Sequence, residues 1–200
     1  MKKIFTVLAV ASALLLTGCG KADTAATIGN VTISQVQAQK TVDELLAERA
    51  KIDTSQLQLQ TGSLLNRGQL RFMIITTIFD ELAKELKIDV SPTEIETTRS
   101  GIYEQIGGEA NLAKNLVAAQ IAPSNFERYM RATVISNKLD SALQASGVAQ
   151  ADVQTKIGEL VQKKGKQMKI SVNPRYGVWD DQTGDLVASD SAGSAVVPAK

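Results

Sequence analysis

Hydrophobic residues recur along this chain at the three- and four-residue spacing of amphipathic helices, and short alternating segments lie near its two ends. The spacing predicts six helices, at about residues 34–50, 64–86, 91–106, 109–119, 124–143 and 153–169. Residues 26–33 and 168–172 have the pattern of strands, and their pairing would bring the ends of the domain together. The predicted fold class is therefore mostly α, with a small sheet formed by the N- and C-terminal strands.

The helix predicted at residues 64–86 is too hydrophobic for an element that is buried on one side only. One set of its residues keeps helical spacing: Ile75, Ile78, Phe79, Leu82 and Leu86. Phe72, Met73 and Ile74 add a second apolar face, which must meet another element or a ligand. We therefore expect this segment to be the central core helix.

Two helix starts carry the residues of a capping box. Ser34 is followed three residues later by Gln37. Ser91-Pro92-Thr93-Glu94 is the strongest local signal, because Ser caps the free N–H groups, Pro suits the first turn and Glu favours the positive helix end. The Gly107-Gly108 pair then predicts a helix stop.

The N-terminus has the pattern of an export signal. Met1-Lys2-Lys3 is cationic, residues 4–16 are an apolar run too short to span a bilayer, and Leu16-Thr17-Gly18-Cys19 follows. The last four residues resemble the bacterial lipobox, which implies acylation of Cys19 and cleavage before it. We expect a protein lipid-anchored to the outer face of the cell membrane or to the outer membrane. The alternative is a plain secretory signal with an incidental cysteine.

Composition excludes several classes of function. The sequence has no histidine and one cysteine, which rules out Ser-His-Asp and Cys-His sites, His-bearing zinc sites and an internal disulfide. Lys plus Arg number 22 and Asp plus Glu number 21, so no basic excess points to nucleic acid. We predict no enzyme activity, no cofactor and no metal.

The same pattern divides the chain into four parts. Residues 1–18 form the lipoprotein signal peptide, and residues 19–26 are a short polar tether. Residues 27–180 form the domain, and residues 181–200 are small and aperiodic, which predicts a disordered tail.

Several motifs, taken in order, resemble one family. Ile-Gly-Asn-Val-Thr-Ile-Ser leads into a helix, Leu-Ala-Lys-Glu-Leu-Lys-Ile-Asp-Val-Ser-Pro-Thr-Glu-Ile follows, and then come Gly-Gly and a Phe-bearing helix. From about Ala26 to Leu143 this order resembles the N-terminal chaperone domain of SurA and PrsA-type foldases. The segment from Ile170 to Asp180 is similar to the closing strand and turn of related secreted lipoproteins.

The resemblance implies binding of unfolded or newly exported polypeptides without ATP. Relatives with isomerase activity insert a parvulin domain, which commonly uses paired histidines, before the closing strand. Here Gly147 to Met168 is too short for such a domain, so no isomerase residue carries over. The implied function is a holdase of the cell envelope.

Adaptable apolar side chains are the candidates for binding a client polypeptide. They are Phe72, Met73, Tyr103, Phe126, Tyr129 and Met130. For each one taken alone, core burial is the favoured interpretation, because apolar stripes at helical spacing usually face the interior. For Tyr176 and Trp179 we expect packing against the sheet, and for Lys163, Lys164, Lys166 and Lys169 a solvated helix end.

Other functions remain open at this point. An adaptor lipoprotein with one dedicated partner would have the same composition. A foldase related to peptidyl-prolyl isomerases is a weaker alternative because the domain that carries the activity is missing. A solute-binding lipoprotein fits least, since alternating strand and helix units are absent from the pattern.

Overall fold

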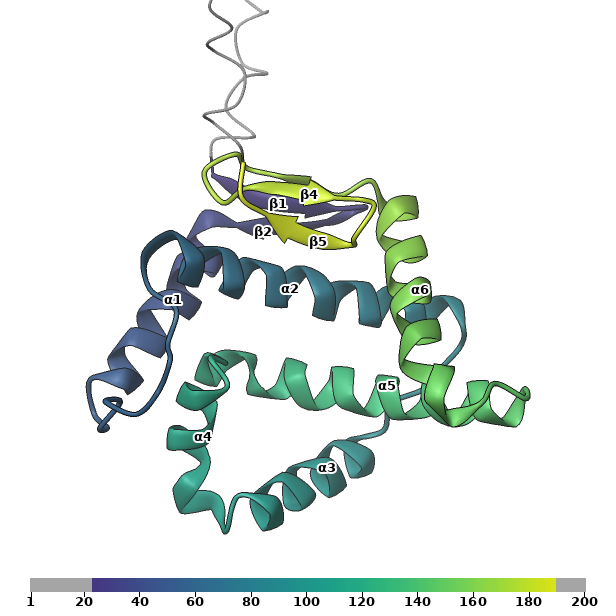
Figure 1. The fold of residues 1–200 in the computed structure, drawn as a ribbon, viewed down its shortest axis with the longest axis horizontal. Helices are drawn as coiled ribbons and strands as arrows, with labels where there is room; N and C mark the ends of the chain where they lie inside the picture. The colour runs from purple at the N-terminus through teal and green to yellow at the C-terminus, as the bar shows by residue number, and fades with distance from the viewer. Residues whose placement is uncertain (1–22, 190–200) are drawn as a thin grey trace, which may run out of the picture.

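The computed structural model describes residues 23–189 (Figure 1). Its six α-helices are α1 Gln35–Arg49, α2 Gly62–Glu85, α3 Pro92–Gln105, α4 Leu112–Ala118, α5 Phe126–Ala145 and α6 Gln150–Met168. Two short 3-10 helices, η2 Glu109–Asn111 and η3 Pro123–Asn125, precede α4 and α5. The strands are β1 Thr24–Ile28, β2 Val31–Ser34, β3 Ser171–Val172, β4 Val178–Asp180 and β5 Asp185–Val187. The predicted mostly α fold is confirmed.

The two ends of the domain meet in a three-stranded antiparallel sheet of order β2-β1-β3. Ala26 of β1 pairs with Val172 of β3, as the pairing of residues 26–33 with 168–172 predicts. The third strand is shorter than expected because α6 continues to Met168 and Lys169 then turns into the left-handed region.

Helix α2 is the centre of the core, as predicted. Leu70, Ile74 and Ile78 are completely buried, and they pack with apolar residues of β1 and α6. The sheet, α2, α5 and α3 follow one another as layers, and α6 runs along one side of them (Figure 1). This order leaves one face of α2 toward the sheet and another toward α5.

Both predicted capping boxes are present. The Ser34 hydroxyl accepts from the Gln37 backbone N–H, and the Gln37 side chain accepts from Ser34 N–H. Ser91 and Glu94 make the same reciprocal pair at the start of α3. Each box satisfies N–H groups that a helix start leaves free, which fixes where α1 and α3 begin.

The predicted tether and tail are both too long. Strand β1 already begins at Thr24, and Ala25 and Ala26 are completely buried, so part of the predicted tether 19–26 belongs to the fold. At the other end, β5 pairs with β4 inside the predicted disordered segment 181–200, and Leu186 is buried opposite Trp179. Strands of three and five residues are too short to show periodicity. Residues 1–22, including Cys19, and 190–200 lie outside the described part.

The aromatic residues near the C-terminus pack as expected. Tyr176 and Trp179 are buried in the core cluster around α2. Gly165 of α6 packs closely against the indole, since a Cβ there would lie 3.4 Å from the Trp179 ring. In the lysine cluster, Lys164 pairs with Glu85 at 2.7 Å, whereas Lys163 and Lys166 are exposed.

Candidate functional site

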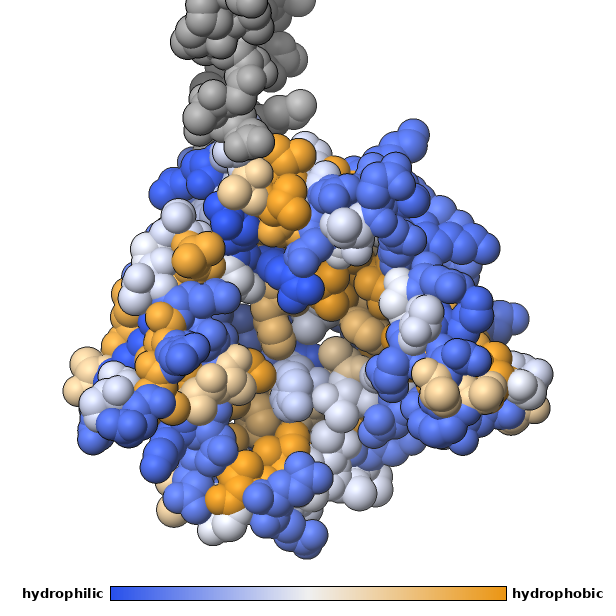
Figure 2. Space-filling model, viewed as in Figure 1, coloured by the Kyte–Doolittle hydropathy of each residue, from blue (hydrophilic) through white to orange (hydrophobic). Residues whose placement is uncertain are grey.

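A groove separates α2 from α5 and is the main candidate site of the described chain. Its volume is about 420 Å³. Its walls are formed by two helical stripes, which are Gly68, Phe72, Ile75, Thr76 and Phe79 of α2 and Tyr129, Ala132, Thr133 and Ser136 of α5. Figure 2 shows it as a hollow at the middle of the molecule, bordered by apolar and weakly polar residues.

The apolar residues that line the groove are only partly buried by the core. Phe72, Ile75 and Phe79 are each of intermediate exposure, although their neighbours Ile74 and Ile78 are completely buried. Tyr129 is 38% exposed on the opposite wall. The groove therefore presents aromatic and aliphatic surface that no other part of the described chain covers.

A polar cluster around Gln120 closes one end of the groove. The Gln120 side-chain oxygen accepts from the Gln60 backbone N–H at 2.9 Å and from Arg49 at 3.3 Å. Gln69 donates to the Gln120 carbonyl at 2.8 Å, and Arg49 donates to the Gln60 carbonyl at 2.7 Å. These bonds tie the α1–α2 connection to the α4–α5 connection, which fixes the spacing of the two walls.

The cluster keeps unused hydrogen-bonding capacity. Gln69 is 2% exposed, and its side-chain oxygen has no partner among the described residues. The Arg49 Nε is also buried without a partner, and burial lowers the pKa of this guanidinium. Buried polar groups without partners cost stability, so this end of the groove is held together at an energetic cost.

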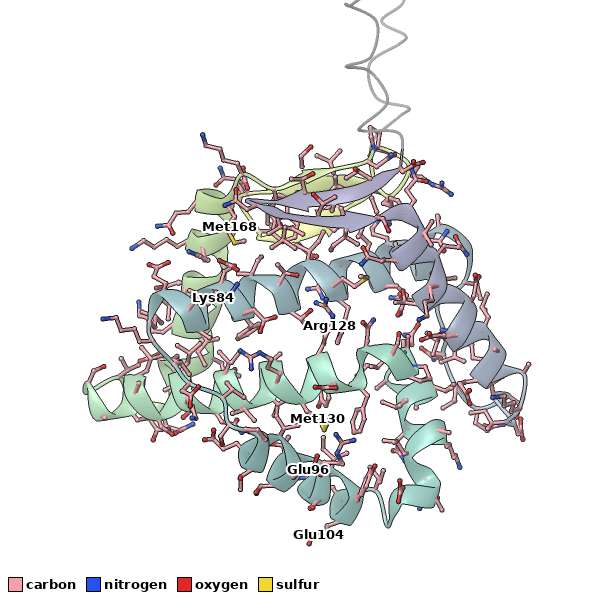
Figure 3. All side chains as sticks on the ribbon, turned by 180° about the vertical axis from the view of Figure 1, so that it is seen from behind. Lys84, Glu96, Glu104, Arg128, Met130 and Met168 are labelled. Carbon is pink, nitrogen blue, oxygen red and sulfur yellow. The ribbon has the colours of Figure 1, made fainter. Side chains whose placement is uncertain are left out.

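Ion pairs brace the groove along its length. Arg131 of α5 donates to Asp80 of α2 at 2.7 Å. Arg71, which lines the groove, pairs with Asp185 of β5. Arg128 has no ion-pair partner among residues 23–189, and in Figure 3 its side chain points from α5 toward α2. Carboxylates therefore balance Arg131 and Arg71, whereas Arg128 adds one cation without an ion-pair partner among the described residues.

Helix α3 supports α5 from the side away from the groove. Lys138 of α5 pairs with Glu94 at 2.7 Å and donates to the Asp89 carbonyl at 2.6 Å. The Lys138 ammonium and the Ser91 backbone and hydroxyl lower the pKa of Glu94 from 4.5 to about 2. The capping box that starts α3 thus also holds the helix behind the groove wall.

The six candidate client-binding residues do not form one surface. Phe72 and Tyr129 line the groove. Met73, Phe126 and Met130 are buried, the last completely, because their side of each helix meets the core. Tyr103 is half-buried on α3 against the cluster of Phe126 and Met130.

Sequence reasoning did not propose most of the groove residues, among them Ile75, Phe79 and Ala132. Ile75 and Phe79 have the same periodicity as the core positions of α2, so spacing alone assigns them to the core. Ala132 also lines the α5 wall, but a small alanine gives no sequence signal for a binding site. The one sequence feature that points to the groove is the second apolar face of α2, which includes Phe72 and must meet another element or a ligand.

The lining of the groove is better suited to binding a ligand than to catalysing a covalent reaction. Arg71 is its one charged lining residue, and the remaining walls are apolar, hydroxyl or amide groups. Among residues 23–189, no three Cys, Asp or Glu side chains cluster as metal ligands, and no helix is long and apolar enough to cross a membrane.

A family model described as the SurA-like N-terminal domain matches residues 1–140. The chain belongs to the SurA-like N-terminal domain family. No curated protein and no solved structure matches the chain significantly. The predicted resemblance is confirmed at the level of the family, which is a chaperone-type family whose domains bind unfolded polypeptides.

The matched region contains both walls of the groove. Residue 140 lies within α5, beyond the last groove residue, Ser136. Helix α6 and the strands β3–β5 follow the match, yet Val153, Ile157 and Trp179 belong to the same core as α2. The SurA-like N-terminal domain is thus completed here by the C-terminal segment.

Proposed function

We propose that this protein is an ATP-independent holdase that binds apolar segments of unfolded or newly exported polypeptides in the α2–α5 groove. One observation carries the proposal: Phe72, Ile75, Phe79 and Tyr129 leave apolar surface uncovered in a concave site within a SurA-like N-terminal domain. The groove is of a size that suits ligand binding. Its hydroxyl and amide groups supply adaptable hydrogen bonds without selecting one sequence.

Location in the cell envelope is the second part of the proposal. The Leu-Thr-Gly-Cys motif after the apolar run of residues 4–16 supports acylation of Cys19 and attachment to a membrane. A holdase tethered there would meet polypeptides as they emerge from export. Burial of two or more acyl chains makes such attachment stable, whereas one chain is marginal.

Aggregation of a denatured client in the presence of residues 19–200 tests the function. The groove variant Tyr129→Asp/Ala132→Glu places two carboxylates on the α5 wall, where they would oppose entry of apolar side chains. We expect wild type to suppress aggregation and this variant to lose most of the effect. Far-UV circular dichroism shows whether the variant is folded.

A matched control separates the groove from general surface hydrophobicity. Leu46→Asp removes an exposed apolar residue of α1 that does not line the groove, and it should suppress aggregation like wild type. Folded wild type without any suppression would contradict the holdase function. Equal suppression by wild type and the groove variant would place the binding surface elsewhere.

A further inference from the structure

Exposed hydrophobic residues gather around the point where the fold begins. Seven large hydrophobic side chains are exposed among residues 23–189. Tyr129 belongs to the groove, and Leu46 and Leu86 lie at the C-terminal ends of α1 and α2. The other four are Val36, Leu64, Val178 and Val187.

Hydrogen bonds place Val36 and the hairpin beside the start of β1. Gln35, the neighbour of Val36, donates its backbone N–H to the Asp23 carbonyl at 2.7 Å. Its side chain accepts from Arg175 at 2.6 Å. Asn173 donates to the Thr24 carbonyl at 3.2 Å, which holds the loop before β4 at the same end of β1.

Val178 and Val187 complete this surface with Leu64. The two valines face each other as cross-strand partners in the β4–β5 hairpin, and they are 53% and 41% exposed. Arg67 donates to the Tyr176 carbonyl at 3.0 Å, and Leu64 lies one helical turn before Arg67. In Figure 2 an apolar patch lies directly beside the atoms where the described chain ends.

The short segment between Cys19 and the fold limits how far this surface can lie from a lipid anchor. Cys19 lies five residues before Thr24, so even a fully extended chain spans about 18 Å between them. An acylated Cys19 would hold this end of the fold next to the bilayer.

We propose that Val36, Leu64, Val178 and Val187 form a membrane-contacting surface that orients the anchored protein on its own bilayer. The surface rests on the proposed acylation of Cys19 but not on client binding. Exposed Arg175 keeps N–H donors beyond its bond to Gln35, and these can bind lipid phosphate. Asp23 is the exposed acid at this edge, so apolar contact dominates and charge contributes less.

The orientation has a consequence for the groove. The sheet lies at one side of the stack of layers, and α5 and α3 lie beyond α2 (Figure 1). With the sheet edge on the bilayer, the α5 wall of the groove is held away from the membrane. Clients then reach the groove from the aqueous side.

Quenching of Trp179 by spin-labelled lipid tests this surface. Trp179 is the single tryptophan of the sequence and adjoins Val178 in β4. Residues 19–200, which contain the whole described fold, are coupled through the single thiol of Cys19 to a maleimide lipid in vesicles with a shallow spin label. This coupling guarantees the tether, so the result does not depend on acylation in the cell.

The test variant is Val36→Asp/Leu64→Asp, which leaves the hairpin around Trp179 unchanged. Both positions lie in the first turn of a helix, where an acidic residue is favourable, so the fold should be kept. The control Leu46→Asp/Leu86→Asp adds the same charge near the other ends of the same two helices. Zwitterionic and anionic vesicles separate apolar contact from attraction of basic side chains to the net negative charge of the lipid surface.

We expect strong quenching for wild type and for the control, and loss of most quenching for the test variant, in both kinds of vesicle. Quenching in anionic vesicles alone would contradict the apolar contact. Weak quenching of tethered wild type, or equal quenching in all three proteins, would overturn the surface. Because no client is present, the outcome is independent of the aggregation assay.

Discussion

The two faces of α2 have similar composition and opposite surroundings. Ile74 and Ile78 are completely buried against the sheet and α6, whereas Ile75 and Phe79 are half-exposed in the groove. Neighbouring residues of one helix therefore have different roles. Burial on the first face stabilises the fold, and incomplete burial on the second leaves surface for a ligand.

The largest expected effect is on the buried face. Ile74→Ala should lower the free energy of unfolding by about 2–5 kcal/mol, because it removes methyl groups and leaves a cavity in a packed core. Urea unfolding followed by circular dichroism measures the change. Ile75→Ala is the matched variant one residue away and should lose clearly less, since its side chain is partly solvated. Equal losses would contradict the division of α2 into two faces.

The next effect concerns the C-terminal hairpin that completes the core. Gly177 has φ +132°, and a Cβ there would overlap the Val187 carbonyl oxygen. Gly177→Ala should therefore cost about 1–3 kcal/mol of stability through strain. Thermal unfolding compares it with Gly101→Ala in α3, where a Cβ meets nothing within 4 Å. That control should be stabilised by about 0.5–1 kcal/mol, as expected in a helix interior.

A smaller effect on stability is expected from the ion pair that links α2 to α5. Asp80→Asn removes the ion pair between Asp80 and Arg131. Both side chains of this pair are partly exposed to solvent. Loss of such a pair should lower the free energy of unfolding by about 0.2–1 kcal/mol. A double-mutant cycle with Arg131→Gln isolates the coupling. A coupling near zero would mean that this ion pair does not help to hold α2 to α5.

The smallest effect is the pH dependence contributed by Glu94. Its pKa is about 2 in the folded protein and 4.5 as the ordinary value, so the unfolded chain binds the proton more tightly. The stabilisation is fully present above about pH 4.5 and is lost as the pH falls toward 2. NMR titration of the carboxyl group should give the low pKa directly.

Two variants locate the cause of that shift. Glu94→Gln should remove this part of the acid sensitivity, whereas Lys138→Gln should raise the pKa of Glu94 only part of the way, because the Ser91 hydrogen bonds remain. A Glu94 carboxyl that titrates near 4.5 in wild type would show that α3 is not held to α5 in this way.

The sequence indicates the elements far better than it indicates the site. Capping residues and helical spacing locate the helices because these signals act within a few neighbouring residues, as at Ser91 and Glu94. Pairing of the terminal strands follows from the alternating segments at the two ends. The short strands β4 and β5 give no periodic signal, and their place depends on packing of Trp179 and Leu186 against the distant α2 and α6.

The groove depends on contacts that local sequence does not contain. Tyr129 and Met130 are adjacent and equally suited to bind a client, yet one lines the groove and the other is completely buried. The difference arises because α5 lies between α2 and α3, which fixes the side of α5 that faces each helix. The spacing of the two walls further depends on Gln120, an ordinary residue of a connecting segment.

Site-specific photo-crosslinking to an unfolded client tests the central claim most directly. A photoreactive phenylalanine derivative replaces Tyr129 in the groove or, as the control, Leu46 on the exposed surface of α1. We expect the Tyr129 position to crosslink an unfolded polypeptide and not its folded form, and the Leu46 position to give background levels only. Crosslinking at Leu46 as strong as at Tyr129, or none at Tyr129 while the client is bound, would contradict the assignment of the groove as the client site.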